Sequence, residues 1–240
     1  MSRNQKTVLI TGANRGLGFG LTKLFLSRGY KVIAAVRDIS SMVKLDGVIF
    51  VKIDAESLTD PKQAVETLQA EYGIKHLDIV IANSGICSDQ DPISSIDPES
   101  FTHHFNINTR GPLTLFQAVR DLLIPSKGGA EGKFVVISSA LGSISWEGHY
   151  KGQTTYGTSK AAVNYLTRKI HFEEPELIAF NIDPGYFESG NGQYAAAFVG
   201  RNPPQTVDEV APQIVDVIEK ATRAQTSGAL WTYNGEKSAW

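Results

Sequence analysis

The chain has 240 residues, 42% of them hydrophobic and 20% charged, which is the composition of an ordinary globular protein. A net charge of −2 without a run of Lys and Arg argues against nucleic acid as a partner, and a single cysteine excludes an intrachain disulfide and favours a reducing compartment. We see neither a signal peptide nor an apolar run of the roughly 18 residues that a membrane span needs, so we expect a cytoplasmic protein without a membrane partner.

Short apolar segments alternate with longer amphipathic segments along the whole chain. The short segments have the length of buried strands, and the longer ones repeat apolar residues at helical spacing. In chain order, we expect a strand at 7–11, a helix at 17–29, strands at 31–36 and 47–54, a helix at 61–73, a strand at 77–85, a helix at 109–124, a strand at 132–139, a helix at 156–170, a strand at 177–185, a helix at 206–222 and an edge strand at 228–235.

This alternation indicates the α/β class, with right-handed crossovers, a parallel sheet and helices on both of its faces. No linker rich in Pro, Gly or Ser interrupts it, so we predict a single doubly wound, Rossmann-type domain over 1–240. A glycine-rich cofactor half would occupy about 1–90, and a catalytic and substrate half about 91–240. Ligands in such a sheet bind at the carboxyl ends of the strands.

The segment TGANRGLG, residues 11–18, lies between the first strand and the first helix. Gly12, Gly16 and Gly18 allow turns and close approaches that side chains would prevent. Backbone N–H groups at the helix start then face an anion. Because the strand and the helix are both in place, the segment predicts dinucleotide binding rather than a tight turn without a ligand.

The end of the second strand normally contacts the cofactor ribose. Arg37 follows this strand, and Arg15 lies in the glycine-rich turn. Two cations suit the 2′-phosphate of NADP, whereas Asp38 would suit the 2′-hydroxyl of NAD. We therefore expect NADP(H) as the cofactor, with NAD as the second choice.

The segment TTYGTSKAAVNYL, residues 154–166, places Tyr156 and Lys160 one turn apart on a helix face. A nearby ammonium favours the phenolate form of tyrosine, which makes the pair a candidate proton donor and acceptor. The alternative is an ordinary surface pair. The position directly after the fifth strand favours the catalytic interpretation.

The spacings G-x-x-x-G-x-G and Y-x-x-x-K resemble those of the short-chain dehydrogenase/reductase family over essentially the whole chain. The segments TGANRGLG, NTRGPLTLFQA and YNGEKSAW are most similar to sniffer-type carbonyl reductases and to fungal norsolorinic acid ketoreductases. The resemblance implies an NADPH-dependent reductase that transfers hydride to an aromatic or apolar ketone or aldehyde, in a setting such as secondary metabolism.

The resemblance also implies which residues contact the cofactor. Asp54 would bond the adenine amino group, and Ser189 stands where a Thr often bonds the carboxamide. ANSG, residues 82–85, corresponds to the N-N-A-G motif of the family, with Ala82 and Ser84 as departures. The expected cofactor-binding residues are Gly12, Asn14, Arg15, Gly16, Leu17, Gly18, Arg37, Asp54, Asn83, Gly85, Tyr156, Lys160, Pro184, Gly185 and Ser189.

The catalytic residues are likewise implied by the resemblance. A serine after the fifth strand polarises the substrate carbonyl in the family; Ser139 fits its local pattern, and Ser143 is the rival because it lies nearer Tyr156 in sequence. Asn108 matches an Asn that holds a kink and a water, with Asn106 as the rival. The expected catalytic residues are therefore Ser139, Tyr156, Lys160 and Asn108.

The substrate, a small carbonyl or alcohol compound, is expected to contact the loop 143–153 and the segment after Gly185. The expected substrate-binding residues are Ser139, Trp146, Tyr150, Tyr186 and Phe187. Aromatic residues of this kind could instead pack an oligomer interface. In the family, helices 109–124 and 156–170 often form a dimer seam, so a homodimer or homotetramer is expected. The five histidines show no metal-ligand spacing, so no metal is expected.

The sequence is also compatible with two other functions. The same fold could carry out non-redox acid–base chemistry, such as dehydration or cyclisation, with the same phenol. It could also serve as a non-catalytic sensor that binds NADP. The presence of all four catalytic residue types favours the reductase.

Overall fold

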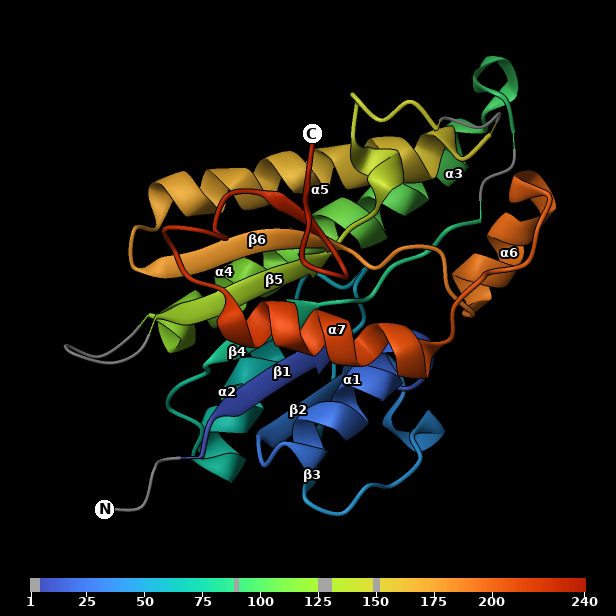
Figure 1. Ribbon diagram of the computed structural model, residues 1–240. Coiled ribbons are helices and arrows are strands. Elements are labelled where there is room, and N and C mark those ends of the chain that lie inside the picture. The colour runs from blue at the N-terminus through green and yellow to red at the C-terminus, as the bar shows by residue number, and fades with distance from the viewer. Residues whose placement is uncertain (1–4, 89–90, 125–130, 149–151) are drawn as a thin grey trace.

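An eight-stranded sheet forms the centre of the structure, a computed structural model that describes residues 5–88, 91–124, 131–148 and 152–240 (Figure 1). The strand order is β3-β2-β1-β4-β5-β6-β7-β8, and neighbouring strands pair in parallel except β7 and β8, which are antiparallel. The strands are β1 (Thr7–Thr11), β2 (Lys31–Val36), β3 (Val48–Lys52), β4 (Ile79–Ala82), β5 (Gly132–Ile137), β6 (Leu177–Asp183), β7 (Leu230–Thr232) and β8 (Lys237–Ser238).

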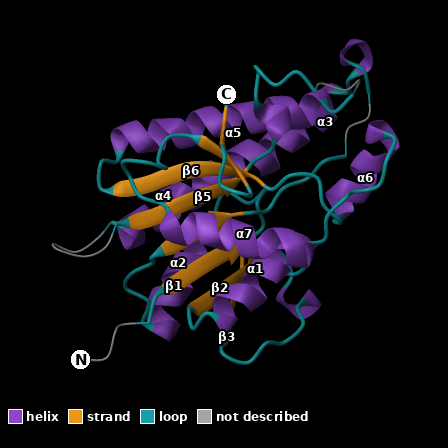
Figure 2. Cartoon of the chain, viewed as in Figure 1, coloured by secondary structure: helices purple, strands orange, loops and turns teal. Residues whose placement is uncertain are grey.

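Helices cover both faces of this sheet, as Figure 2 shows. They are α1 (Gly16–Ser27), α2 (Asp60–Tyr72), α3 (Pro98–Phe105), α4 (Gly111–Leu123), α5 (Thr154–Glu173), α6 (Gly190–Val199) and α7 (Val207–Lys220). α1 and α7 pack on one face, whereas α2, α4 and α5 pack on the other. α6 lies beyond the carboxyl end of β6 (Figure 1).

The alternation of side chains along each strand produces one apolar core on each face. Val8 and Ile10 of β1 belong to the core beneath α1 and α7, and Leu9 between them belongs to the core beneath the other helices. Burial of each such side chain stabilises the fold by about 1.5–3 kcal/mol. The sheet therefore holds its strand ends rigidly in place.

The order in which strands are added to the sheet reverses at β1. β2 and β3 lie on one side of β1, and β4 and the later strands lie on the other. Val8 of β1 pairs with Val32 of β2 on one side and with Ile79 of β4 on the other. This is the doubly wound order, in which the carboxyl ends of the two central strands form the ligand-binding edge. The predicted α/β fold class, with one doubly wound sheet covered by helices, is confirmed.

Some elements differ from the expected ones. α3 and α6 were not predicted, because GNGQYAAAFV of α6 lacks a helical repeat of large apolar residues. The helix expected from residue 109 begins at Gly111, since Asn106–Arg110 form a π-helical turn. β7 (Leu230–Thr232) is shorter than the expected strand 228–235, and the chain after it turns back to form β8.

Candidate active site

The turn between β1 and α1 gathers backbone N–H groups at the start of the helix. Gly12 has a φ of 64°, in the left-handed region. A Cβ on Gly18 would lie 2.2 Å from the carbonyl oxygen of Gly12, so no side chain fits there. The first turn of α1 has neither a side-chain cap from Arg15 nor an acidic residue, and Asn14 is exposed. These features fit a cofactor phosphate.

The end of β2 carries the residues expected to discriminate between NADP and NAD. Arg15 and Arg37 are both exposed. The Asp38 carboxylate accepts hydrogen bonds from the Ser40 hydroxyl (2.7 Å) and the Ser40 N–H (2.9 Å), which lower the pKa of this carboxyl. Asp38 is thus engaged in its own turn, and the exposed cations fit a 2′-phosphate.

Several residues that are expected to contact the cofactor are hydrogen-bonded or packed within the protein itself. The Asn83 amide donates to the carbonyl oxygen of Thr11 (2.8 Å), and the Asn83 N–H donates to the Thr11 hydroxyl (3.0 Å). Asp54 Oδ1 accepts from the N–H of Glu56 (3.0 Å). The Leu17 side chain is buried in the core beneath α1, so only its backbone can face a ligand. Asn83 therefore joins β4 to the glycine-rich turn.

Ser139 and Tyr156 come together from two elements. Tyr156 lies in the first turn of α5, and its oxygen accepts a hydrogen bond from the Ser139 hydroxyl at the end of β5. Ser139 Oγ in turn accepts from the N–H of Leu141 (3.2 Å). Ser143 is only 2% exposed, and its hydroxyl lies 3.3 Å from that of Ser145. Of the two candidate serines, Ser139 is thus the one that contacts Tyr156.

Lys160 lies beside the same phenol, with Nζ 5.6 Å from the centre of the Tyr156 ring. Its ammonium donates a hydrogen bond of 2.8 Å to the carbonyl oxygen of Ile137. A Cβ on Gly85 would lie 3.4 Å from this Nζ, so the turn after β4 passes close to the lysine. Burial lowers the pKa of Lys160 to about 8.

Burial has the opposite effect on the tyrosine. Burial raises the pKa of Tyr156, the neighbouring Cys87 and Asp183 add to this rise, and the Ser139 hydrogen bond opposes it. The sequence had suggested that Lys160 would shift the phenol toward its anion. In the protein alone, burial outweighs that influence, so Tyr156 is a protonated acid at neutral pH.

Asn108 is fully buried in the π-helical turn that precedes α4. Its amide accepts from the N–H of Ile86 (2.9 Å) and donates to the carbonyl oxygen of Ile86 (2.9 Å) and to the Ser159 hydroxyl (3.0 Å). Ser159 donates to the carbonyl oxygen of Tyr156 (2.7 Å), so Asn108 is linked through Ser159 to the first turn of α5. Asn106 instead bonds a surface carboxylate at 3.4 Å.

The turn after β6 faces the start of α1. Pro184 is buried, and Gly185 has a φ of 74°. Ser189 caps α6, because its hydroxyl accepts from the N–H of Gly192 at 2.9 Å. A Cβ on Gly16 would lie 3.9 Å from the Cβ of Ser189, which brings the two helix starts together.

The expected substrate-binding residues have different surroundings. Trp146 is partly buried, and the Tyr186 hydroxyl donates to the carbonyl oxygen of Arg201 (2.7 Å). Phe187 is 8% exposed and packs in the core beneath α1 and α7, which leaves little of its ring for a substrate. Tyr150 lies outside the described residues.

Two residues near Tyr156 were not among the expected site residues. Ser159 links Asn108 to the backbone of Tyr156, and Asp183 lies between the Ser139 turn and the turn at Gly185. A weak signal was available for each, since Ser159 precedes Lys160 and Asp183 precedes the Pro-Gly pair. One partner of each is far away in sequence, Asn108 for Ser159 and Ala140 for Asp183, and the spacing alone does not reveal it.

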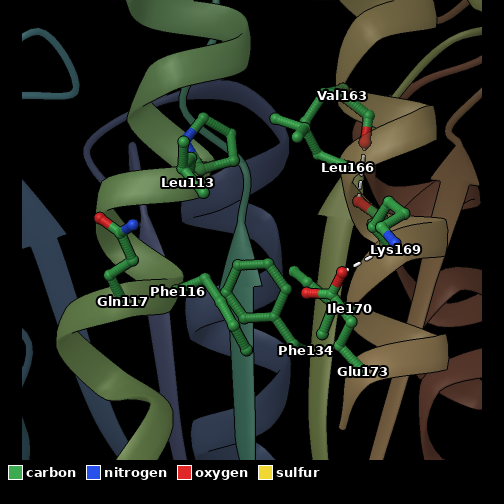
Figure 3. A pocket seen from close by; sticks show the side chains of 11 residues that line it. Leu113, Phe116, Gln117, Phe134, Val163, Leu166, Lys169, Ile170 and Glu173 are labelled. Carbon is green, nitrogen blue, oxygen red and sulfur yellow. Dashed lines mark hydrogen bonds and ion pairs between the residues drawn. The ribbon is translucent and has the colours of Figure 1, made fainter.

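An apolar groove of about 200 Å³ lies between α4 and α5 (Figure 3). None of the expected catalytic residues lines it. The lining residues are Pro112, Leu113, Phe116, Gln117, Phe134, Val163, Leu166, Thr167, Lys169, Ile170 and Glu173. Over the described ranges, no group of three or more His, Cys, Asp or Glu side chains could hold a metal ion. No helix in the described part of the chain is long and apolar enough to cross a membrane.

Comparisons with known proteins agree with this geometry. The family model for the short chain dehydrogenases matches residues 6–198. The norsolorinic acid ketoreductase of Aspergillus parasiticus is 38% identical over 246 residues, covering 97% of this chain and 90% of that protein. The NADPH-bound carbonyl reductase from chicken fatty liver superposes with a TM-score of 0.85 at 25% identity, over 99% of this chain and all of that one.

A second solved structure supports the fold alone. The carbonyl reductase Sniffer of D. melanogaster superposes with a TM-score of 0.86 at 23% identity, over 99% of this chain and 100% of that chain. The family match spans most of the sequence, and the Aspergillus relative covers nearly all of it. The chain therefore belongs to the short-chain dehydrogenase/reductase family of oxidoreductases.

Proposed function

We propose that the protein is an NADPH-dependent ketoreductase that reduces the carbonyl group of an aromatic or apolar ketone or aldehyde. The observation that carries this proposal is the hydrogen bond between Ser139 and Tyr156, with the Lys160 ammonium 5.6 Å from the phenol ring. When bound, NADPH supplies the hydride for the carbonyl carbon. The side chains that surround the carbonyl oxygen then have to supply a proton and hydrogen bonds.

Tyr156 is the proton donor in this proposal. Its raised pKa keeps the phenol protonated at neutral pH, so that it can give its proton to the carbonyl oxygen as the alcohol forms. Ser139 holds the same oxygen by a hydrogen bond. Lys160, with a pKa of about 8, returns a proton to Tyr156, and Asn108 holds the turn of α5 that carries Tyr156 through Ser159. Hydride on carbon and proton on oxygen together account for the alcohol product.

NADPH is favoured over NADH by the two exposed arginines and by the carbonyl reductase that was solved with NADPH. Arg15 and Arg37 lie at the start of α1 and the end of β2, where a 2′-phosphate would bind. Asp38, which would favour NAD, is held by Ser40. The remaining cofactor-binding residues expected from the sequence are part of this proposal.

The substrate class rests on the relatives and on the aromatic side chains near the site. The relatives at 37–39% identity are named as norsolorinic acid ketoreductases. Trp146 and Tyr186 are the partly buried aromatic residues at the expected substrate side. An apolar or aromatic ketone, as found in secondary metabolism, fits such side chains.

The assembly proposed is a homodimer or homotetramer in the cytoplasm, with a second copy seated on the groove between α4 and α5. This groove is lined by apolar side chains, including Phe116 and Ile170 (Figure 3), and α5 also exposes Tyr165 (66%) and Phe172 (62%). Exposed apolar surface of this kind favours association. Analytical ultracentrifugation of the wild type and of Leu166→Glu, which places a charge in the groove, tests the contact.

The function is tested by mixing purified protein with NADPH, or separately with NADH, and a panel of aromatic ketones, quinones and aldehydes. Loss of reduced-nicotinamide absorbance with NADPH, together with an alcohol product identified by mass, supports the reductase. NADPH binding without turnover would favour the sensor. Conversion of a candidate substrate that persists after the cofactor is removed would favour non-redox acid–base chemistry.

A further inference from the structure

The strands β5 and β6 stop pairing immediately before the catalytic serine. Their register ends at Ile137 opposite Ile182, and the N–H of Ser138 makes the last backbone hydrogen bond, to the carbonyl oxygen of Ile182 (2.7 Å). Beyond this point both segments turn away from the sheet. Ser139 leads into a short 3-10 turn, and Asp183 leads into the Pro-Gly turn. Some other contact must therefore hold the two turns together.

Asp183 provides that contact. Its Oδ1 accepts a hydrogen bond of 3.1 Å from the N–H of Gly185, and its carboxylate also accepts from the N–H of Ala140. Ala140 directly follows Ser139, so one carboxylate binds a donor from each turn. Asp183 thus takes the place of the backbone pairing that ends at Ser138.

We propose that Asp183 is a positioning residue for proton transfer: its carboxyl group fixes the Ser139 turn so that the serine hydroxyl reaches Tyr156. The inference rests on the proposed reductase function.

The groups around the phenol come from α5 and β6. On α5 itself, the Lys160 ammonium lies 5.6 Å from the phenol ring. Burial raises the pKa of the Asp183 carboxyl on β6, and the N–H donors of Gly185 and Ala140 offset this rise only in part. The positioning role depends on these two hydrogen bonds and not on a charge at Asp183.

The Ser139 turn is also held from its other side, so a substitution of Asp183 should leave the fold intact. The Asn164 amide donates to the carbonyl oxygen of Gly142 (3.2 Å) and accepts from the Ser138 hydroxyl (2.6 Å). These contacts come from α5 and do not involve Asp183. Removal of the carboxylate should release only the side of the turn that faces β6.

The test compares Asp183→Asn and Asp183→Ala with Asp46→Asn, which makes the same substitution at an exposed position outside the site. Asparagine keeps one acceptor oxygen but loses the other, and alanine loses both. We expect kcat for ketone reduction to fall about tenfold in the Asn variant and about a hundredfold in the Ala variant, with NADPH affinity within about twofold of wild type.

A second readout does not need turnover. With the tyrosine ring labelled with ¹³C at Cζ, the Tyr156 resonance is identified by its loss in Tyr156→Phe. We expect it to shift in the cofactor-free Asp183→Asn protein and not in Asp46→Asn. A wild type that reduces no carbonyl would contradict the proposed function, and the resonance would still decide whether Asp183 sets the surroundings of Tyr156.

The inference is overturned if the Tyr156 resonance and kcat are both the same in Asp183→Asn as in wild type. It is also overturned if kcat and NADPH affinity fall together, because that pattern indicates a structural role only. A fall in kcat with a shifted Tyr156 resonance and unchanged NADPH affinity supports it.

Discussion

The ammonium of Lys160 donates a 2.8 Å hydrogen bond to the carbonyl oxygen of Ile137, the last residue of β5. This contact places a buried cation at the strand end from which Ser139 also projects, and Lys160 is only 4% exposed. The Lys160 side chain on α5 is thus tied directly to the backbone at the end of β5. The Lys160 ammonium is therefore a buried charge that lowers the stability of the folded protein.

Lys160→Met is therefore expected to stabilise the protein near pH 7 while it abolishes activity. The folded-state pKa of about 8 lies below the ordinary value of 10.5, so the charged form is disfavoured by about 3 kcal/mol on folding. Loss of the donor to the Ile137 carbonyl offsets about 1 kcal/mol of this. The melting temperature should rise by several degrees.

The pH dependence of this effect has a defined sign. The destabilising contribution of Lys160 is fully present below pH 8 and disappears as the pH rises through 10.5. Thermal unfolding of wild type and variant at about pH 7 and about pH 10 should therefore show a difference that shrinks at the higher pH. A variant less stable than wild type at neutral pH would contradict the assignment of a buried charge.

The two candidate serines form a matched pair of substitutions. Ser139→Ala removes the hydroxyl that bonds Tyr156, and we expect kcat to fall by about 10²- to 10³-fold, as for loss of one oxyanion donor. Ser143→Ala removes a buried hydroxyl that contacts Ser145, and kcat should change only a few-fold. Steady-state kinetics on both variants gives the comparison, and a larger loss in Ser143→Ala would reverse the roles.

Cofactor preference should depend on the arginine after β2. Arg37→Ala is expected to weaken NADPH binding by about tenfold or more and to leave NADH binding nearly unchanged, because only NADPH carries the 2′-phosphate. Lys44→Ala, at an exposed position farther along the same loop, is the control for loss of a positive charge. Fluorescence titration measures both cofactors, and equal losses for NADPH and NADH would argue against a 2′-phosphate contact.

The two candidate asparagines differ in burial and should differ in their effect on stability. Asn108→Ala leaves the N–H and carbonyl of Ile86 without their partners, and we expect the free energy of unfolding to drop by about 1–3 kcal/mol. Asn106→Ala, at the surface, should change it by about 0.5 kcal/mol or less. Denaturant unfolding measures both, and similar values would show that Asn108 does not anchor the turn.

Much of the fold is predictable from the sequence, because buried strands and amphipathic helices leave clear periodicities. The strands from β1 to β6 and the helices α1, α2, α4, α5 and α7 follow such patterns. α6 does not, since its glycines and alanines carry no apolar repeat, and only the Ser189 cap marks its start. The π-helical turn at Asn106–Arg110 is likewise hidden, because its residues would suit an ordinary helix.

The candidate site is predictable only where its residues lie in local motifs. Tyr156 and Lys160 share one helix turn, so their proximity follows from spacing. The choice between Ser139 and Ser143 depends on how the loop before α5 folds, which spacing does not determine. Asp183 meets Ala140 only because β5 and β6 are neighbours in the sheet.

The most direct test of the account compares NADPH oxidation by wild type and Tyr156→Phe in the presence of an aromatic ketone, with NADPH affinity measured for both proteins. The account predicts turnover in the wild type and a loss of about 10²- to 10⁴-fold in the variant, with NADPH affinity retained, because only the transferred proton is missing. Comparable turnover in Tyr156→Phe would contradict the assignment of Tyr156 as the proton donor.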